Sequence, residues 1–79
     1  MENKMNTLED LVRIIRILRS ENGCPWDRVQ THASIRMDML EEAYEAADAI
    51  DKKDMKNLCE ELGDVLMQVV FHAEIETEQ

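Results

Sequence analysis

The sequence contains few of the residues that interrupt helices or build loop-rich folds. It has two glycines, one proline and three aromatic residues among 79 positions, whereas 34% of its residues are charged. This composition is typical of an all-α protein. The two cysteines, Cys24 and Cys59, are too few for a disulfide framework and lack the spacing of a zinc site. We therefore expect free thiols in a reducing compartment.

The sequence also lacks a long apolar run and a charged-then-apolar leader, so we expect a soluble, cytoplasmic protein. Its net charge of −9 argues against a nucleic-acid polymer or a membrane as partner, because both require a basic surface. A phosphate substrate is still compatible with this charge if divalent cations bridge the two sets of oxygens. A single domain of this length has a small core, which favours oligomerisation.

The first predicted helix runs from about Leu8 to Ser20, where apolar residues recur at three- and four-residue steps. Thr7 is its candidate N-cap. Glycine and proline predict a loop over residues 23–32, and Thr31 is the candidate cap of the next helix.

Two longer helices follow. The second is predicted from about Ala33 to Lys52 or Lys53, and the third from about Met55 to Glu76. Asp54 lies in the polar break between them and is a reasonable N-cap for the third helix.

Two short acidic clusters, residues 41–45 and 60–64, carry most of the chemical information. Each contains two carboxylates three residues apart, Glu42 with Glu45 and Glu61 with Asp64. Like charges at this spacing lie on one helix face and repel each other. A hard divalent cation with oxygen ligands would relieve that repulsion. The clusters are either a metal site or a solvated acidic surface.

A helical-wheel projection helps to separate these two interpretations. In the second helix Glu42 falls inside the apolar arc, while Glu45 and Asp38 lie at its edge. A carboxylate in such a stripe is unfavourable unless it is paired or ligates a metal. The apolar arc contains Ile35, Met39, Ala43, Ala46, Ala49 and Ile50.

The third helix is apolar on both sides of a narrow polar strip, so we expect it to be covered on most sides and the strip to lie in a cleft. Its broad apolar face contains Leu58, Leu62, Val65, Leu66, Val69 and Ala73. The polar strip contains Glu61, Asp64, Gln68 and His72.

Several other interpretations compete. Arg13, Arg16 or Arg36 could form buried ion pairs with the four inward carboxylates instead of a metal. Trp26 is either a plug on the open end of the bundle, which we favour, or a stacking surface for a base. The pattern favours a core or interface role for His72. Three further acidic residues are expected to be ordinary solvated charges, namely Glu41, Asp48 and Glu60.

Taken together, five segments resemble a MazG-type nucleoside triphosphate pyrophosphohydrolase over residues 8–73. Their order and spacing are far more specific than a lone pair of glutamates. The segments are Gly23-Cys24-Pro25-Trp26-Asp27, Gln30-Thr31-His32, Leu40-Glu41-Glu42-Ala43-Tyr44-Glu45, Glu60-Glu61-Leu62-Gly63-Asp64-Val65-Leu66 and Gln68-Val69-Val70-Phe71-His72-Ala73.

The resemblance implies an all-α fold that dimerises, or forms a dimer of dimers, to complete a four-helix bundle. It implies Mg²⁺-dependent hydrolysis of nucleoside triphosphates to monophosphate and pyrophosphate, with Mn²⁺ as an alternative ion. The family's metal ligands map onto Glu42, Glu45, Glu61 and Asp64. Glu41 or Glu45 would accept a proton from the attacking water, and Trp26 and Arg36 are candidate substrate contacts.

The sequence departs from the family pattern in two places. Met37 and Asp38 stand where relatives often have proline and tyrosine. Relatives usually continue into a further helix and a basic segment, so we expect residues 1–79 to be one helical domain without that helix. The alternative function is a non-catalytic oligomerisation or regulatory module. A di-iron site is disfavoured, because no acidic residue has a histidine three positions later.

Overall fold

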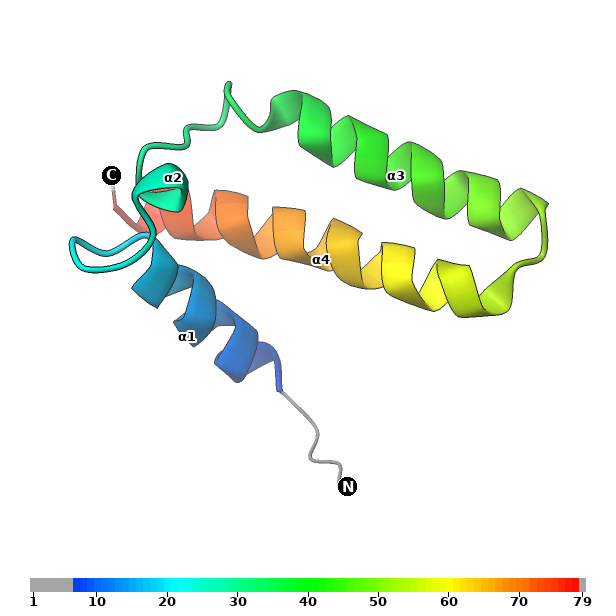
Figure 1. The fold of residues 1–79 in the computed structure, drawn as a ribbon, viewed down its shortest axis with the longest axis horizontal. Coiled ribbons are helices and arrows are strands. Elements are labelled where there is room, and N and C mark those ends of the chain that lie inside the picture. The colour runs from blue at the N-terminus through cyan, green and yellow to red at the C-terminus, as the bar shows by residue number, and fades with distance from the viewer. Residues whose placement is uncertain (1–6, 79) are drawn as a thin grey trace.

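The computed structural model describes residues 7–78. It contains four helices, α1 (Leu8–Leu18), α2 (Pro25–Arg28), α3 (Arg36–Asp51) and α4 (Met55–Thr77) (Figure 1). No β-strand occurs within these described residues. The all-α prediction is therefore confirmed.

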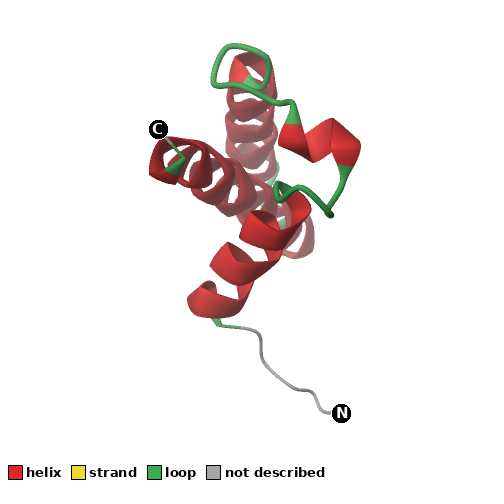
Figure 2. Cartoon of the chain, turned by 90° about the vertical axis from the view of Figure 1, so that its left-hand side faces the viewer, coloured by secondary structure: helices red, strands yellow, loops and turns green. Residues whose placement is uncertain are grey.

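The helices α3 and α4 form an antiparallel hairpin, and α1 packs across the C-terminal half of α4 (Figure 1). The short helix α2 lies near the same end of α4, as the view along the molecule also shows (Figure 2). The molecule measures 41 × 35 × 18 Å. Viewed down the shortest of these axes, α1, α4 and α3 spread out beside one another, so one face of each long helix has little to pack against (Figure 1).

The helix α1 begins as the sequence predicts. The Thr7 hydroxyl accepts a hydrogen bond from the Asp10 amide, and the Asp10 carboxylate accepts one from the Thr7 amide, each at 3.1 Å. The helix ends at Leu18 instead of Ser20, because the chain folds back and the Cys24 amide donates to the Leu18 carbonyl at 2.8 Å. A side chain on Gly23 would collide with that backbone, which is why glycine stands there.

Two details between α1 and α3 correct the sequence prediction. The predicted loop contains α2, which starts at Pro25 because proline suits the first position of a helix. The next helix begins at Arg36, three residues later than expected, and Thr31 does not cap it. The Thr31 hydroxyl instead accepts from the Ser34 amide at 3.1 Å in a turn that precedes the helix.

The connection between α3 and α4 is a tight turn built on Lys53. Its φ of 58° lies in the left-handed region. The Asp54 amide donates to the Ala49 carbonyl and the Lys53 amide to the Ile50 carbonyl, which is the Schellman arrangement. The Asp54 carboxylate then accepts from the Asn57 amide at 3.2 Å, so the prediction of this N-cap is confirmed.

The core is small and consists largely of aliphatic side chains. Its buried apolar members are Ile15, Ile35, Ala46, Ala49, Val70 and Ile75. Among the described helices, none is both long and apolar enough to cross a bilayer.

Within this chain, the prediction that α4 is covered on most sides is wrong. Leu62, Leu66 and Val69 are 52%, 44% and 50% exposed, and Ile50 on α3 is 55% exposed. Ala43 is also exposed although it lies in the predicted apolar arc. The reason is that α3 covers one side of this long helix and α1 crosses only its C-terminal half, which leaves these apolar residues exposed.

Arg19 joins three helices at one end of the molecule. This buried side chain donates two hydrogen bonds of 2.7 Å to the Glu78 carboxylate. It also donates to the carbonyls of Asp27, at 2.7 Å, and Gln30, at 3.0 Å, and its guanidinium lies 5.4 Å from the centre of the Phe71 ring. The segment after α2 is thereby attached to both α1 and α4.

Candidate metal centre

The hairpin brings together three carboxylates that are distant in sequence. Glu42 and Glu45 lie one turn apart on α3, and Glu61 extends toward them from α4. One oxygen from each lies within 4.8 Å of the others. Because α3 and α4 run antiparallel and are joined by a short turn, the middle of α3 comes beside the first half of α4 (Figure 1). The fold thus places the two acidic clusters opposite each other.

Two of these carboxylates are only partly accessible. Glu42 and Glu61 are half-buried, while Glu45 is exposed. Glu42 Oε1 and Glu61 Oε1 are buried and have no hydrogen-bond partner within residues 7–78. Native proteins rarely leave a buried carboxylate oxygen unsatisfied, because its desolvation is uncompensated.

The electrostatics of the cluster are unfavourable for three negative charges. Desolvation raises the pKa of Glu42, and repulsion from Asp64 and Glu45 raises it further. Desolvation also raises the pKa of Glu61, with additional contributions from contact with Glu45 and from the charge of Asp64. Both shifts mean that the ionised carboxylates of Glu42 and Glu61 are unfavourable here unless a positive charge lies beside them.

The donor set fits a hard divalent cation. All three groups offer oxygen ligands, which Mg²⁺ and Mn²⁺ prefer, and two of the oxygens lack any other partner. Asp64, the fourth predicted ligand, is exposed and lies outside the group of three, although its charge acts on Glu42 and Glu61. The structure therefore brings together three of the four predicted ligands.

The acidic residues expected at the margin are exposed. Glu41, Asp48 and Glu60 all lie on the accessible surface. Glu41 is next to Glu42 in sequence but is not part of the carboxylate group.

The alternative of arginine pairing is wrong for this chain. Arg13 binds Asp10 at 2.9 Å, and Arg16 binds both oxygens of Glu74 at 2.9 and 3.1 Å. Arg36 contacts the Met37 sulfur at 3.7 Å. None of the ion pairs in the described part of the chain involves the four predicted ligands.

Trp26 is not a plug in this chain. Its side chain is 78% exposed on α2, because the short helix directs it away from the core. Its backbone carbonyl accepts a hydrogen bond of 2.9 Å from the Gln30 side chain. The indole face is therefore accessible.

A cavity of about 250 Å³ is lined by Gln68, so the cleft expected along the polar strip is present at this residue. Asp38 is one turn before Glu42 on α3, and Gln68 is one turn after Asp64 on α4, so the cavity lies about one turn along the hairpin from these carboxylates, which do not line it. Gln68 Oε1 is buried without a partner in the described residues. In the sequence, this cavity was indicated by Gln68, a polar residue in the narrow strip between the two apolar sides of the third helix. Its lining residues are Asp27, Gln30, Ile35, Asp38, Met67, Gln68 and Phe71.

Comparison with known proteins links this arrangement to a family. The chain is 55% identical over 71 residues to the nucleoside triphosphate pyrophosphohydrolase/pyrophosphatase MazG of Thermotoga maritima, covering 90% of this chain and 28% of that protein. It is 50% identical over 76 residues to a nucleoside triphosphate pyrophosphohydrolase of Escherichia coli K12, covering 95% of this chain and 29% of that one. It is also 58% identical over 62 residues to the uncharacterized protein YabN of Bacillus subtilis, covering 78% of this chain and 13% of that protein.

The chain spans less than a third of the length of each of these relatives. A family model described as the MazG nucleotide pyrophosphohydrolase domain matches residues 30–79, which include all of α3 and α4 and every candidate ligand. This confirms the resemblance inferred from the sequence motifs. On this match, the chain belongs to the MazG nucleotide pyrophosphohydrolase domain family.

Proposed function

We propose that this chain hydrolyses nucleoside triphosphates to nucleoside monophosphate and pyrophosphate with the help of Mg²⁺. The observation that carries the proposal is the group formed by Glu42, Glu45 and Glu61, two of which have buried oxygens without partners. The names of the Thermotoga and Escherichia relatives support this substrate class.

In this proposal Glu42, Glu45, Glu61 and Asp64 hold the cation, and Mn²⁺ can replace Mg²⁺. A bound divalent cation neutralises phosphate oxygens and makes water more acidic. The acidic chain, with a net charge of −9, would otherwise repel a triphosphate. Asp64 is exposed on the same helix as Glu61, so its side chain is free to change rotamer when the ion binds.

Two carboxylates are candidates for the general base. Glu45 is exposed and belongs to the carboxylate group, and Glu41 is exposed beside it. Either can accept the proton of the attacking water as its oxygen joins a phosphorus atom. Cleavage of the phosphoanhydride bond between the α- and β-phosphates then releases monophosphate and pyrophosphate.

The nucleoside has a place in the adjoining cavity. Phe71 and Ile35 supply apolar surface there, and the partnerless Gln68 Oε1 supplies an acceptor. We include Trp26 and Arg36 as substrate contacts. The exposed indole can stack on a base, and Arg36 is the first residue of the helix that carries Glu42.

We also propose that two copies of residues 1–79, as a single domain, form a homodimer or a dimer of dimers. The exposed apolar residues Leu62, Leu66 and Val69 lie on the longest helix, and a second hairpin would cover them in a four-helix bundle. The free thiols and net charge support a cytoplasmic location without a nucleic-acid polymer or membrane as partner.

The test is product analysis after incubation of the chain with each nucleoside triphosphate and Mg²⁺. The proposal predicts equal amounts of monophosphate and pyrophosphate, and loss of both when the metal is chelated. Formation of diphosphate and orthophosphate, or turnover that is insensitive to chelation, would contradict it.

A further inference from the structure

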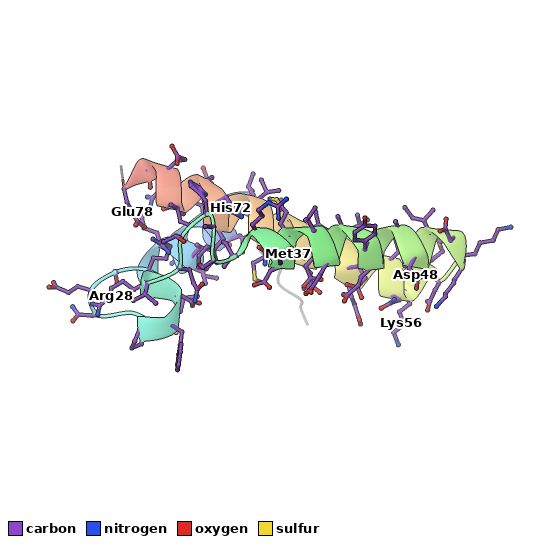
Figure 3. The ribbon with its side chains drawn as sticks, turned by 90° about the horizontal axis from the view of Figure 1, so that it is seen from above. Arg28, Met37, Asp48, Lys56, His72 and Glu78 are labelled. Carbon is purple, nitrogen blue, oxygen red and sulfur yellow. The ribbon has the colours of Figure 1, made fainter. Side chains whose placement is uncertain are left out.

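Two histidines form a direct contact between the segment before α3 and the C-terminal half of α4. His32 Nδ1 lies 2.7 Å from His72 Nδ1, and His32 Nε2 lies 2.6 Å from Glu76 Oε2. The two rings are parallel within 4°, with centres 4.9 Å apart. His72 is at the end of the molecule where this segment passes over α4 (Figure 3). These three side chains form a continuous chain of hydrogen bonds.

This chain of hydrogen bonds is compatible with two protonation states. When both rings are neutral, His32 donates to Glu76 and accepts from His72. When His32 alone is charged, it donates to both Glu76 and His72. When both rings are charged, two N–H groups face each other across 2.7 Å and the contact is lost.

His32 attaches the middle of its segment directly to α4, whereas Gln30 at the start of the segment is connected to Glu78 through Arg19. The side chains of Thr31 and Ser34 bond within the segment, with the Thr31 amide donating to the Ser34 hydroxyl at 2.8 Å. Gln30 and Ile35, at the two ends of the segment, both line the cavity beside the carboxylates. The position of the segment therefore sets one wall of that cavity.

No other charged group makes an ion pair with either ring among residues 7–78. On α4, Glu74 and Glu78 are engaged by Arg16 and Arg19 of α1, which leaves Glu76 for His32. On α3, Arg36 contacts the Met37 sulfur. Partial burial and the neighbouring His32 both lower the pKa of His72, so the second proton binds only at acidic pH.

We propose that His32, His72 and Glu76 are positioning residues that hold residues 30–35 closely against α4 until both histidines are charged. The contact between the two rings is intact at neutral pH and is lost at acidic pH, which leaves the hydrogen bond between His32 and the exposed Glu76 to hold the segment more loosely. Any effect of this link on catalysis rests on the proposed function, because the segment would shape the nucleoside cavity. The existence of the link does not depend on the proposed function.

The experiment is amide hydrogen exchange of the nucleotide-free chain between pH 5 and pH 8, corrected for intrinsic exchange. The Ser34 and Ile35 amides are the probes, because both donate hydrogen bonds inside the segment. We expect them to exchange about fivefold faster at pH 5 than at pH 7.5, the effect of losing one hydrogen bond. The Leu58 amide, near the far end of α4, should show no such change.

Three variants separate positioning from general stability. His72→Leu should give fast exchange of both probes at every pH. His72→Asn keeps a polar group near the Nδ1 position that does not titrate, so it should restore protection and abolish the pH dependence. Glu76→Gln keeps an oxygen that can accept from His32 Nε2, so it should keep both the protection and its pH dependence.

Equal protection of the wild-type probes across this pH range would overturn the proposal, and so would wild-type protection in His72→Leu. A chain that hydrolyses no nucleotide but shows the expected exchange pattern would contradict the proposed function alone. Normal hydrolysis with pH-independent exchange would contradict the histidine link alone.

Discussion

At the scale of single residues, the acidic side chains that conflict with their surroundings are the informative ones. Glu42 lies in the arc that also contains the buried Ala46 and Ala49, and its Oε1 has no partner in the described chain. The helical wheel was sufficient to identify Glu42, Glu45 and Glu61 as inward or marginal. It could not predict the exposure of Asp64, because that depends on how far α4 rotates against α3.

The first prediction concerns Glu42→Gln. Without metal, this variant should melt several degrees above the wild type, because it removes a half-buried charge that is repelled by Asp64 and Glu45. It should also lose the increase in melting temperature that Mg²⁺ gives the wild type. Thermal unfolding with and without Mg²⁺ measures both effects, with the exposed Glu41→Gln as matched control. A wild-type response to Mg²⁺ in Glu42→Gln would contradict the ligand assignment.

The second prediction concerns the pair formed by Arg19 and Glu78. The hydrogen bond from Arg19 lowers the pKa of Glu78 below its usual value of 4.5, so the pair stabilises the fold above that pH and the contribution is lost as pH falls through the lowered pKa. Glu78→Gln should therefore cost about 1 kcal/mol at pH 7, given that the carboxylate is partly exposed. The cost should disappear in strongly acidic solution. Urea unfolding at a series of pH values tests this, and a pH-independent difference would speak against it.

At the scale of elements, helix existence was predictable and helix starts were less so. Thr7 and Asp54 cap their helices as predicted, because each side chain bonds an amide three residues later. The predicted start of α3 was three residues too early. Thr31 and Ser34 bond each other in a turn before the helix, and a threonine in such a turn cannot be told from a helix N-cap in the sequence.

The third prediction uses the turn between α3 and α4. Lys53→Gly should stabilise the chain by roughly 0.5–1 kcal/mol, because glycine adopts the left-handed conformation at that position without steric cost. Lys52→Gly is the matched control, since Lys52 has a φ of −85° and should gain nothing. Chemical denaturation of both variants gives the comparison, and equal effects would show that the backbone conformation is not the cause.

At the scale of the whole molecule, the chain is thin and leaves much of α4 uncovered. The apolar pattern predicted a helix covered on most sides, yet α3 and α1 together leave Leu62, Leu66 and Val69 exposed. The exposure of this apolar surface could not be predicted from the sequence pattern. The pattern shows which residues are apolar, but not whether the same chain or a second copy covers them. An exposed apolar face on the longest helix is typical of an association surface.

The fourth prediction is that the wild-type chain is a dimer or tetramer and that Leu66→Glu dissociates it. A buried glutamate in the new interface would be unpaired, and this is strongly unfavourable. Sedimentation equilibrium measures the mass of both, with Glu60→Lys as a control on the exposed margin of the same helix. A monomeric wild type would refute the proposed bundle.

The central claim is that the carboxylates joined by the hairpin bind the cation needed for hydrolysis. Its most direct test is pyrophosphate release as a function of Mg²⁺ concentration for the wild type, Glu61→Gln and the neighbouring Glu60→Gln. Glu61 belongs to the three-carboxylate group whereas Glu60 is exposed outside it. We predict that Glu61→Gln loses at least about 100-fold in rate, as expected when a ligand of a catalytic ion is removed, while Glu60→Gln keeps the wild-type Mg²⁺ dependence. Unchanged hydrolysis by Glu61→Gln would contradict the account.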